Sequence, residues 1–172
     1  MHRLVALHPS YHGSGAAGTH ETAYLAVLDD DEVVYIARNG PNRNMNTGYV
    51  LGARVPAQVT AAGMLMLSMR SDAELEHWLD NRALTVFTSH TITCPAEMRR
   101  ELALIRTQDW ALCEQQLNLD SRGIAVPLRD RHGALAGALN ITMPMGRETG
   151  KGAVARVLPM LRETAQAMRD LI

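Results

Sequence analysis

Hydrophobic and polar positions alternate most regularly between residues 119 and 143. Read with a period of two, Ile124, Val126 and Leu128 fall on one face, as in a strand that is half buried. A polar turn at 130–133 ends in glycine, and the apolar alternation then resumes. Such a turn typically joins two antiparallel strands. We therefore predict a long central hairpin around which the chain is organised.

Two polar residues, Asn140 and Thr142, interrupt the apolar run in the second strand of this hairpin. Because they are two positions apart, they point to the same face of the strand. On the protein surface they would be solvated, whereas in a cavity they would offer hydrogen-bonding groups to a small molecule. Both are therefore candidate ligand-binding residues.

Further strands are expected on either side of the hairpin. Residues 21–28 and 32–38 are strand-like stretches joined by three consecutive aspartates, which predicts a hairpin with an acidic loop. The aspartates could suggest calcium, but the central glycine and distal glutamate of an EF-hand are missing, so we expect a solvated loop. Residues 45–51 and 110–113 are predicted to form two more strands.

In four segments the apolar residues recur at helical spacing instead of at every second position. Residues 57–69 carry apolar side chains at helical intervals, and Thr60 can cap the first turn. Ser71 opens a second helix with a capping box, and the third has a proline in its first turn. The last helix spans about 154–172, and Pro159 predicts a kink or a fresh start within it. Together these elements favour an α+β fold, with one antiparallel sheet and helices packed on its faces.

Residues 1–20 are expected to be an irregular lead-in, because their glycines disfavour a stable helix. The histidines in this segment, among them His2, His8 and His12, have no common metal-ligand spacing. We therefore expect no metal site there, and we place a single domain at residues 21–172.

The composition is that of an ordinary globular protein, with 47% hydrophobic and 20% charged residues among 172. The net charge of −1 supplies no overall basic field, so DNA contacts would have to come from another part of the molecule. The two cysteines, Cys94 and Cys113, make no disulfide framework and suit a reducing cytoplasm. No signal pattern or long apolar run appears. We therefore expect a cytoplasmic protein with no membrane contact and no cofactor.

The predicted helix at 57–69 begins with small residues, Ala61, Ala62 and Gly63. Small side chains leave the amides of a first helical turn accessible, and the partial positive charge there favours a carboxylate. Close packing of a helix on a sheet also requires small residues. Both interpretations remain open from the residues alone.

Four stretches, in this order and spacing, resemble the effector-binding domain of the isocitrate lyase regulator (IclR) family of bacterial transcription factors. They are Glu32–Arg38, Gly52–Gly63, Ser121–Asp130 and Gly137–Thr142. The resemblance covers about residues 21–172. It implies a GAF-like fold, in which an antiparallel sheet with helices on its faces holds a cleft for a small organic acid.

The resemblance also implies site residues. In the family, the ligand is held by the small-residue helix start, by a polar residue after a neighbouring strand, and by both strands of the hairpin. The corresponding positions here are Ala61, Ala62, Gly63, Cys113, Gly123, Asn140 and Thr142, with apolar walls expected from Leu51, Met64, Leu112 and Ile124. The sequence departs from the family at Cys113, where an acidic residue is usual, and at Met64, where a basic residue is usual.

The residues around Arg54–Pro56 and Ala138–Ile141 resemble those of relatives that sense aromatic acids and their breakdown products. Examples of such effectors are protocatechuate, 4-hydroxybenzoate and β-ketoadipate. Family members form homodimers or tetramers and bind DNA through an N-terminal winged helix-turn-helix domain, which no stretch of this chain resembles. The expected partners are a small organic acid and further copies of the chain.

Three classes of function compete. The predicted one is a ligand-sensing domain that changes DNA binding by rearranging an oligomer when it binds a small organic carboxylate, with aromatic acids among the candidates. The alternative is a degenerate dimerisation module that binds no ligand. A GAF-like reductase acting through Cys94 or Cys113 is disfavoured, because no histidine or aspartate adjoins either cysteine in sequence to lower its pKa. We therefore predict no enzymatic activity.

Overall fold

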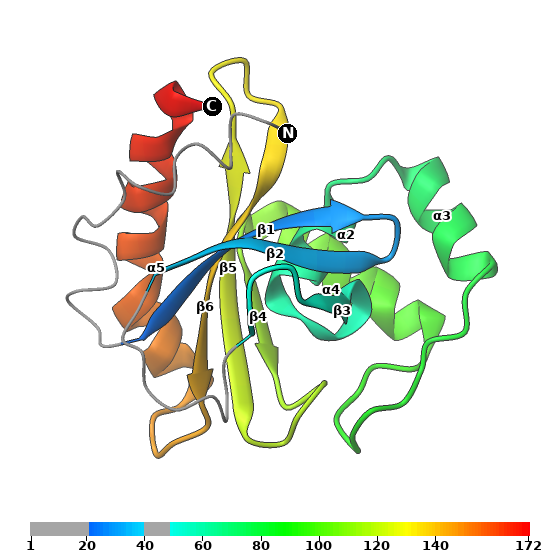
Figure 1. The fold of residues 1–172 in the computed structure, drawn as a ribbon. Coiled ribbons are helices and arrows are strands. Elements are labelled where there is room, and N and C mark those ends of the chain that lie inside the picture. Colours follow the sequence, from blue (N-terminus) through cyan, green and yellow to red (C-terminus); the bar gives the residue numbers. More distant parts are fainter. Residues whose placement is uncertain (1–20, 40–48) are drawn as a thin grey trace.

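Six antiparallel strands form one sheet at the centre of the computed structural model, which describes residues 21–39 and 49–172. The strands are β1 (Thr22–Asp29), β2 (Glu32–Asn39), β3 (Arg54–Pro56), β4 (Ala111–Glu114), β5 (Ser121–Arg129) and β6 (Leu135–Pro144). Their order across the sheet is β3-β2-β1-β6-β5-β4. The two hairpins β1–β2 and β5–β6 therefore meet in the middle (Figure 1).

Helices cover both faces of this sheet. They are α2 (Ala61–Ser68), α3 (Asp72–Asp80), α4 (Pro95–Gln108) and α5 (Gly150–Met168), with 3-10 turns η1 (Ala57–Val59) and η2 (Arg169–Leu171). Figure 1 shows α5 along one face, while α2, α3 and α4 lie on the other. The predicted α+β architecture is confirmed.

The central hairpin joins β5 and β6 in a register that runs from Ser121 opposite Pro144 to Arg129 opposite Leu135. Its apolar face is buried against α5, where Ile124 and Val126 lie in one cluster with Val157 and Leu161 of the helix. The opposite face carries the smaller residues. The alternation read from the sequence thus determines which side of the hairpin α5 covers.

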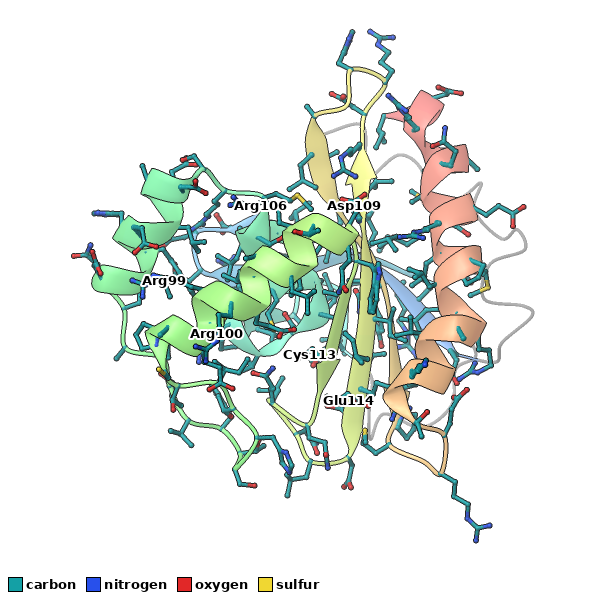
Figure 2. The ribbon with its side chains drawn as sticks, turned by 180° about the vertical axis from the view of Figure 1, so that it is seen from behind. Arg99, Arg100, Arg106, Asp109, Cys113 and Glu114 are labelled. Carbon is teal, nitrogen blue, oxygen red and sulfur yellow. The ribbon has the colours of Figure 1, made fainter. Side chains whose placement is uncertain are left out.

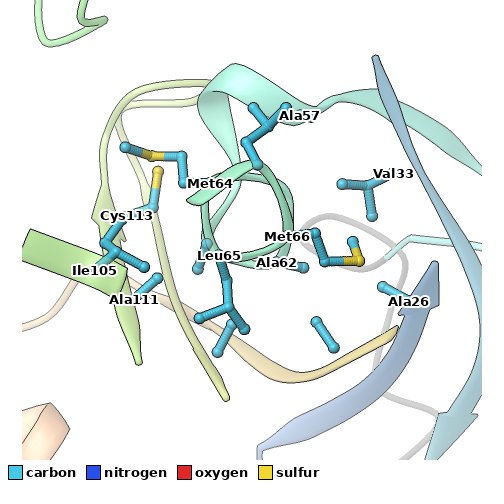
Figure 3. Packing of buried hydrophobic residues seen from close by; sticks show 14 of the residues in the cluster. Ala26, Val33, Ala57, Ala62, Met64, Leu65, Met66, Ile105, Ala111 and Cys113 are labelled. Atoms are coloured by element: carbon cyan, nitrogen blue, oxygen red, sulfur yellow. The ribbon is translucent and has the colours of Figure 1, made fainter. Parts of the chain in front are cut away.

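All eight residues of α2 are buried, because the helix is packed between the sheet, α4 and η1. Figure 3 shows Met64 directed toward Cys113 of β4 and Met66 toward Val33 of β2. At Gly63, an added Cβ would overlap the backbone of Ala57 in η1. This close approach requires glycine, and it holds the beginning of α2 in a defined place.

The acidic loop between β1 and β2 is partly solvated, as expected, with the side chains of Asp29 and Asp30 64% and 78% exposed. Asp31 differs, because its carboxylate accepts a 3.1 Å hydrogen bond from the Trp78 indole of α3 and pairs with Arg82. The loop therefore also joins the first hairpin to α3. Among the residues described, no group of acidic, histidine or cysteine side chains could hold a metal ion.

Several element boundaries differ from the prediction. Residues 45–48 lie outside the described part of the chain, and 49–51 are not in a strand. The strand next to β2 is instead Arg54–Pro56, beyond a turn in which Gly52 has a φ of +82°. A glycine in this left-handed conformation reverses the chain and shortens the strand.

The predicted helix at 57–69 is divided at Thr60, which has extended dihedral angles (φ −127°, ψ 146°) and caps α2. Of the kink or fresh start predicted at Pro159, the fresh start is wrong, since α5 is continuous from Gly150 to Met168. Packing of the helix on the sheet outweighs the single backbone hydrogen bond that a proline removes. The lead-in expected at 1–20 lies outside the described residues, and within them no helix is long and apolar enough to cross a membrane.

Candidate functional site

A small cavity of about 20 Å³ lies between the start of α2 and the face of the sheet opposite α5. Its volume is enough for about one water molecule. The cavity is lined by Tyr35, Tyr49, Val59, Thr60, Ala61, Cys113, Gln115, Gln116, Leu117, Ser121, Arg122, Gly123, Asn140 and Thr142. Residues from six separate parts of the chain therefore meet here.

The N-terminus of α2 opens onto this cavity. The Thr60 side chain accepts a 3.1 Å hydrogen bond from the amide of Gly63, which satisfies one donor of the first turn. The amides of Ala61 and Ala62 precede the first complete turn, so they have no carbonyl within the helix to bond. Below them, an added Cβ at Gly123 of β5 would lie 3.2 Å from the Cβ of Ala61. Gly123 thus lets the helix start approach the sheet closely.

Asn140 is the polar side chain of the cavity whose environment is most unusual. It is 2% exposed, and its Nδ2 donates a 3.2 Å hydrogen bond to Thr142 Oγ1. Its Oδ1 is buried and has no hydrogen-bond partner within the described residues. A buried acceptor left without a donor costs about 1–3 kcal/mol. Because Asn140 lines the cavity, a molecule with a hydrogen-bond donor could satisfy this oxygen there.

Cys113 lies on the floor of the cavity, where β4 faces α2 (Figures 2 and 3). Its thiol donates a 3.3 Å hydrogen bond to the carbonyl of Val59. Burial raises the pKa of the Cys113 thiol to about 12, and the charges of Glu101 and Glu114 act in the same direction. The thiol is therefore neutral near pH 7 and is not activated as a nucleophile.

The raised pKa of Cys113 predicts a loss of stability at alkaline pH. An unfolded cysteine titrates near 9.0, so above that pH the unfolded chain loses a proton that the folded protein keeps until about pH 12. The contribution of Cys113 to the free energy of unfolding is therefore fully present below pH 9. It decreases above that pH, by about 2 kcal/mol at roughly pH 10.5. Urea unfolding at about pH 8 and at about pH 10.5 measures this decrease. Cys113→Ala should show a smaller decrease by about that amount, whereas equal decreases would contradict the assignment.

Three tyrosines form an aromatic group at the other end of the cavity. The rings of Tyr35 and Tyr49 are stacked, with centroids 4.5 Å apart and an angle of 11° between planes. Tyr24 lies 5.0 Å from Tyr35, and its hydroxyl accepts a 3.1 Å hydrogen bond from the amide of Tyr49. Burial raises the pKa of Tyr35 beyond its usual range and that of Tyr49 to about 12, so both hydroxyls stay protonated.

Sequence reasoning missed this aromatic group and the Gln115–Leu117 segment. The period of β2 already put Tyr35 on the same face as Val33, but it did not say which face of the sheet met α2. The backbone carbonyls of Gln115 and Gln116 accept hydrogen bonds from the hydroxyls of Thr88 and Thr91. No local sequence pattern predicts such contacts between distant segments.

The structure brings together five of the expected ligand-binding residues: Ala61, Cys113, Gly123, Asn140 and Thr142 line the cavity. Ala62 and Gly63 are buried in α2 behind it, and the Gly63 amide is already bonded to Thr60. These two residues can therefore contribute to a ligand site only through the backbone of the helix start.

The four expected apolar walls lie elsewhere. Leu112 and Ile124 alternate with cavity residues along their strands, so they face α5 on the other side of the sheet. Leu51 is 52% exposed on the turn before β3. Met64 is buried in the core, where its sulfur is 3.8 Å from Gln116 Nε2. Because side chains alternate along a strand, Leu112 and Ile124 point away from the cavity and cannot form its walls.

The chain is similar in sequence to known bacterial regulatory proteins. The chain is 34% identical to the Pca regulon regulatory protein of Pseudomonas putida, over 88% of this chain and 52% of that protein. It is 32% identical to the p-hydroxybenzoate hydroxylase transcriptional activator of Acinetobacter baylyi, over 91% of this chain and 59% of that protein. The chain thus spans little more than half the length of these relatives.

Solved structures have the same fold. The inducer-binding domain of a double mutant of the PobR transcription factor from Acinetobacter, in complex with 3-hydroxybenzoic acid, superimposes with a TM-score of 0.86. It is 30% identical in sequence, and the match covers 99% of this chain and 94% of that one. IclR from Thermotoga maritima gives a TM-score of 0.80 at 26% identity, over 89% of this chain and 62% of that one.

A six-stranded antiparallel sheet with helices on both faces and a polar cavity at a helix N-terminus defines a GAF-like domain. The chain belongs to the family described as bacterial transcriptional regulator IclR C-terminal, whose model matches residues 16–169. The relatives are transcriptional regulators rather than enzymes.

Proposed function

We propose that this domain senses a small aromatic hydroxy acid and that ligand binding changes the arrangement of subunits in an IclR-type regulator. The observation that carries this proposal is the buried Oδ1 of Asn140, an acceptor to which none of the described residues donates, in a cavity that also contains a helix N-terminus. The first feature favours a ligand hydroxyl, and the second favours a carboxylate.

In the proposed complex, the carboxylate accepts hydrogen bonds from the amides of Ala61 and Ala62. Gly123 lies directly below these amides and carries no side chain, so the helix start lies close to β5 at this point. The ligand hydroxyl donates to Asn140 Oδ1, and the ring lies toward Tyr35. The names of the relatives support this chemical class, since one is the p-hydroxybenzoate hydroxylase transcriptional activator and a double mutant of PobR was solved with 3-hydroxybenzoic acid.

The regulatory output is a property of the whole regulator. We propose that the domain forms homodimers or tetramers and that DNA is bound through a winged helix-turn-helix domain, as in other members of the family. The net charge of −1 is consistent with this division, because it gives the domain no general attraction for DNA. Such a regulator would work in the cytoplasm.

A thermal-shift screen tests the ligand class. The panel contains 3- and 4-hydroxybenzoate, the corresponding methoxybenzoates, benzoate and aliphatic acids such as pyruvate. A ligand at about 100 times its Kd adds roughly 2.7 kcal/mol of stability, or about 5–10 °C for a domain of this size. We expect the hydroxybenzoates to give the largest shifts, because only they carry both a carboxylate and a donor for Asn140.

Two results would contradict this proposal in different ways. If a methoxybenzoate bound as tightly as its hydroxy counterpart, Asn140 Oδ1 would not accept a ligand hydrogen bond. If no acid shifted the unfolding temperature, the domain would be a dimerisation module without a ligand, and oligomer formation would be its remaining function.

A further inference from the structure

The cavity is too small, as it stands, for the class of ligand proposed above. It measures about 20 Å³, whereas a cavity that binds benzene has roughly 150 Å³. Some part of the lining must therefore move before an aromatic acid can enter. The structure indicates which residue this is.

Most of the lining is fixed by secondary structure or by several hydrogen bonds. Residues from β2, β4, β5 and β6 belong to the paired sheet, and Ala61 begins a helix that is buried throughout. The Gln115–Leu117 segment is outside the strands, but hydrogen bonds to its backbone hold it in place. The carbonyls of Gln115 and Gln116 accept bonds of 2.5 and 2.7 Å from Thr88 and Thr91, and the Gln115 amide donates to the carbonyl of Ser121 at 2.9 Å.

Tyr49 is held differently from the rest of the lining. It lies in neither a helix nor a strand, and its ring is kept in place by contacts with Tyr35 and Tyr24. The following turn is anchored to β2, since Gly52 donates a 2.8 Å bond to the carbonyl of Tyr35. The ring can therefore leave the stack by rotating about its own side-chain bonds while the backbone stays anchored. The adjacent Val50 is 59% exposed, so open solvent is within reach of the displaced ring.

We infer that the Tyr49 ring occupies the place that the ring of the effector takes, and that the effector replaces it in the stack on Tyr35. This inference rests on the proposed function, because it requires an aromatic ligand. Tyr49 would then be a competitor built into the chain and a specificity-determining residue. A ligand ring restores the stacking that the displacement breaks, whereas an aliphatic acid does not.

The first experiment needs no ligand and uses Cys113 as a reporter on the cavity floor. In a Cys94→Ser background, which removes the exposed thiol, the rate of alkylation by iodoacetamide is measured. Tyr49→Ala should accelerate the reaction several-fold, while Tyr49→Phe, which keeps the ring, should match the parent. Leu161→Ala on the opposite face controls for general loss of stability. Equal rates for Tyr49→Ala and its parent would overturn the inference.

The second experiment measures the Kd of 3-hydroxybenzoate by calorimetry. Without the competing ring, Tyr49→Ala should bind about two- to tenfold more tightly, the equivalent of one aromatic pair. Val50→Ala, an exposed neighbour, should leave the Kd unchanged. Weaker binding by Tyr49→Ala would make Tyr49 a wall that clamps the ligand, which overturns the inference and leaves the proposed function intact. Absence of binding by both proteins would overturn both.

Discussion

Gly63→Ala is expected to lower the free energy of unfolding by about 3 kcal/mol or more, the upper end of the usual effect of overpacking. The added Cβ would overlap the carbonyl oxygen and Cα of Ala57, which are backbone atoms and cannot turn aside. The overlap can be relieved only by moving η1 away from α2. Since Thr60 connects these two elements and caps the helix, the cavity would be distorted as well.

Urea unfolding of the two proteins measures this loss. Gly146→Ala is the matched control, because its added Cβ would meet no atom within 4 Å. The control should differ from the parent by less than about 0.5 kcal/mol, as surface substitutions usually do. Equal stabilities for Gly63→Ala and Gly146→Ala would show that η1 and α2 separate at little cost.

Asn140→Leu is expected to change stability and ligand binding in opposite directions. Leucine has a similar size but no oxygen to leave unsatisfied, so the ligand-free domain should gain about 1 kcal/mol or more. Binding of a hydroxybenzoate should weaken by roughly 1–3 kcal/mol, about 5- to 150-fold, because the hydroxyl then has no acceptor. A site that is strained until its ligand arrives behaves in this way.

Thr142→Val provides the comparison for this prediction. It removes the hydroxyl that receives the bond from Asn140 Nδ2, so a second buried polar atom loses its partner. This variant should therefore be less stable than the parent, while Asn140→Leu should be more stable. Thermal unfolding without ligand and calorimetry with 3-hydroxybenzoate give the two quantities. A less stable Asn140→Leu domain would mean that Oδ1 is already satisfied in solution.

The alternation of side chains along a strand is the part of the fold that the sequence predicted best. It identified the central hairpin, and it placed Asn140 and Thr142 together on the face that turned out to line the cavity. The same rule also shows why the predicted walls Leu112 and Ile124 lie on the far side, next to α5. A periodic pattern states which residues share a face, but it does not state which face meets which helix.

The rest of the site depends on contacts that no local pattern encodes. The stack of Tyr49 on Tyr35 forms only because the turn before β3 is bonded back to β2. The unsatisfied oxygen of Asn140 likewise follows from the burial of one amide under α2, not from the identity of its neighbours in sequence. Tertiary packing decides both.

The cavity and α5 lie on opposite faces of the central hairpin, so a single layer of β-sheet separates them. Asn140 faces the cavity, whereas the next residue, Ile141, is buried in the cluster that contains Val157 and Leu161 of α5. Consecutive residues of a strand move together, so a shift of β6 toward a bound ligand must also change how its opposite face fits α5. In the proposed function, ligand binding would therefore displace α5 through the single peptide bond that joins Asn140 to Ile141.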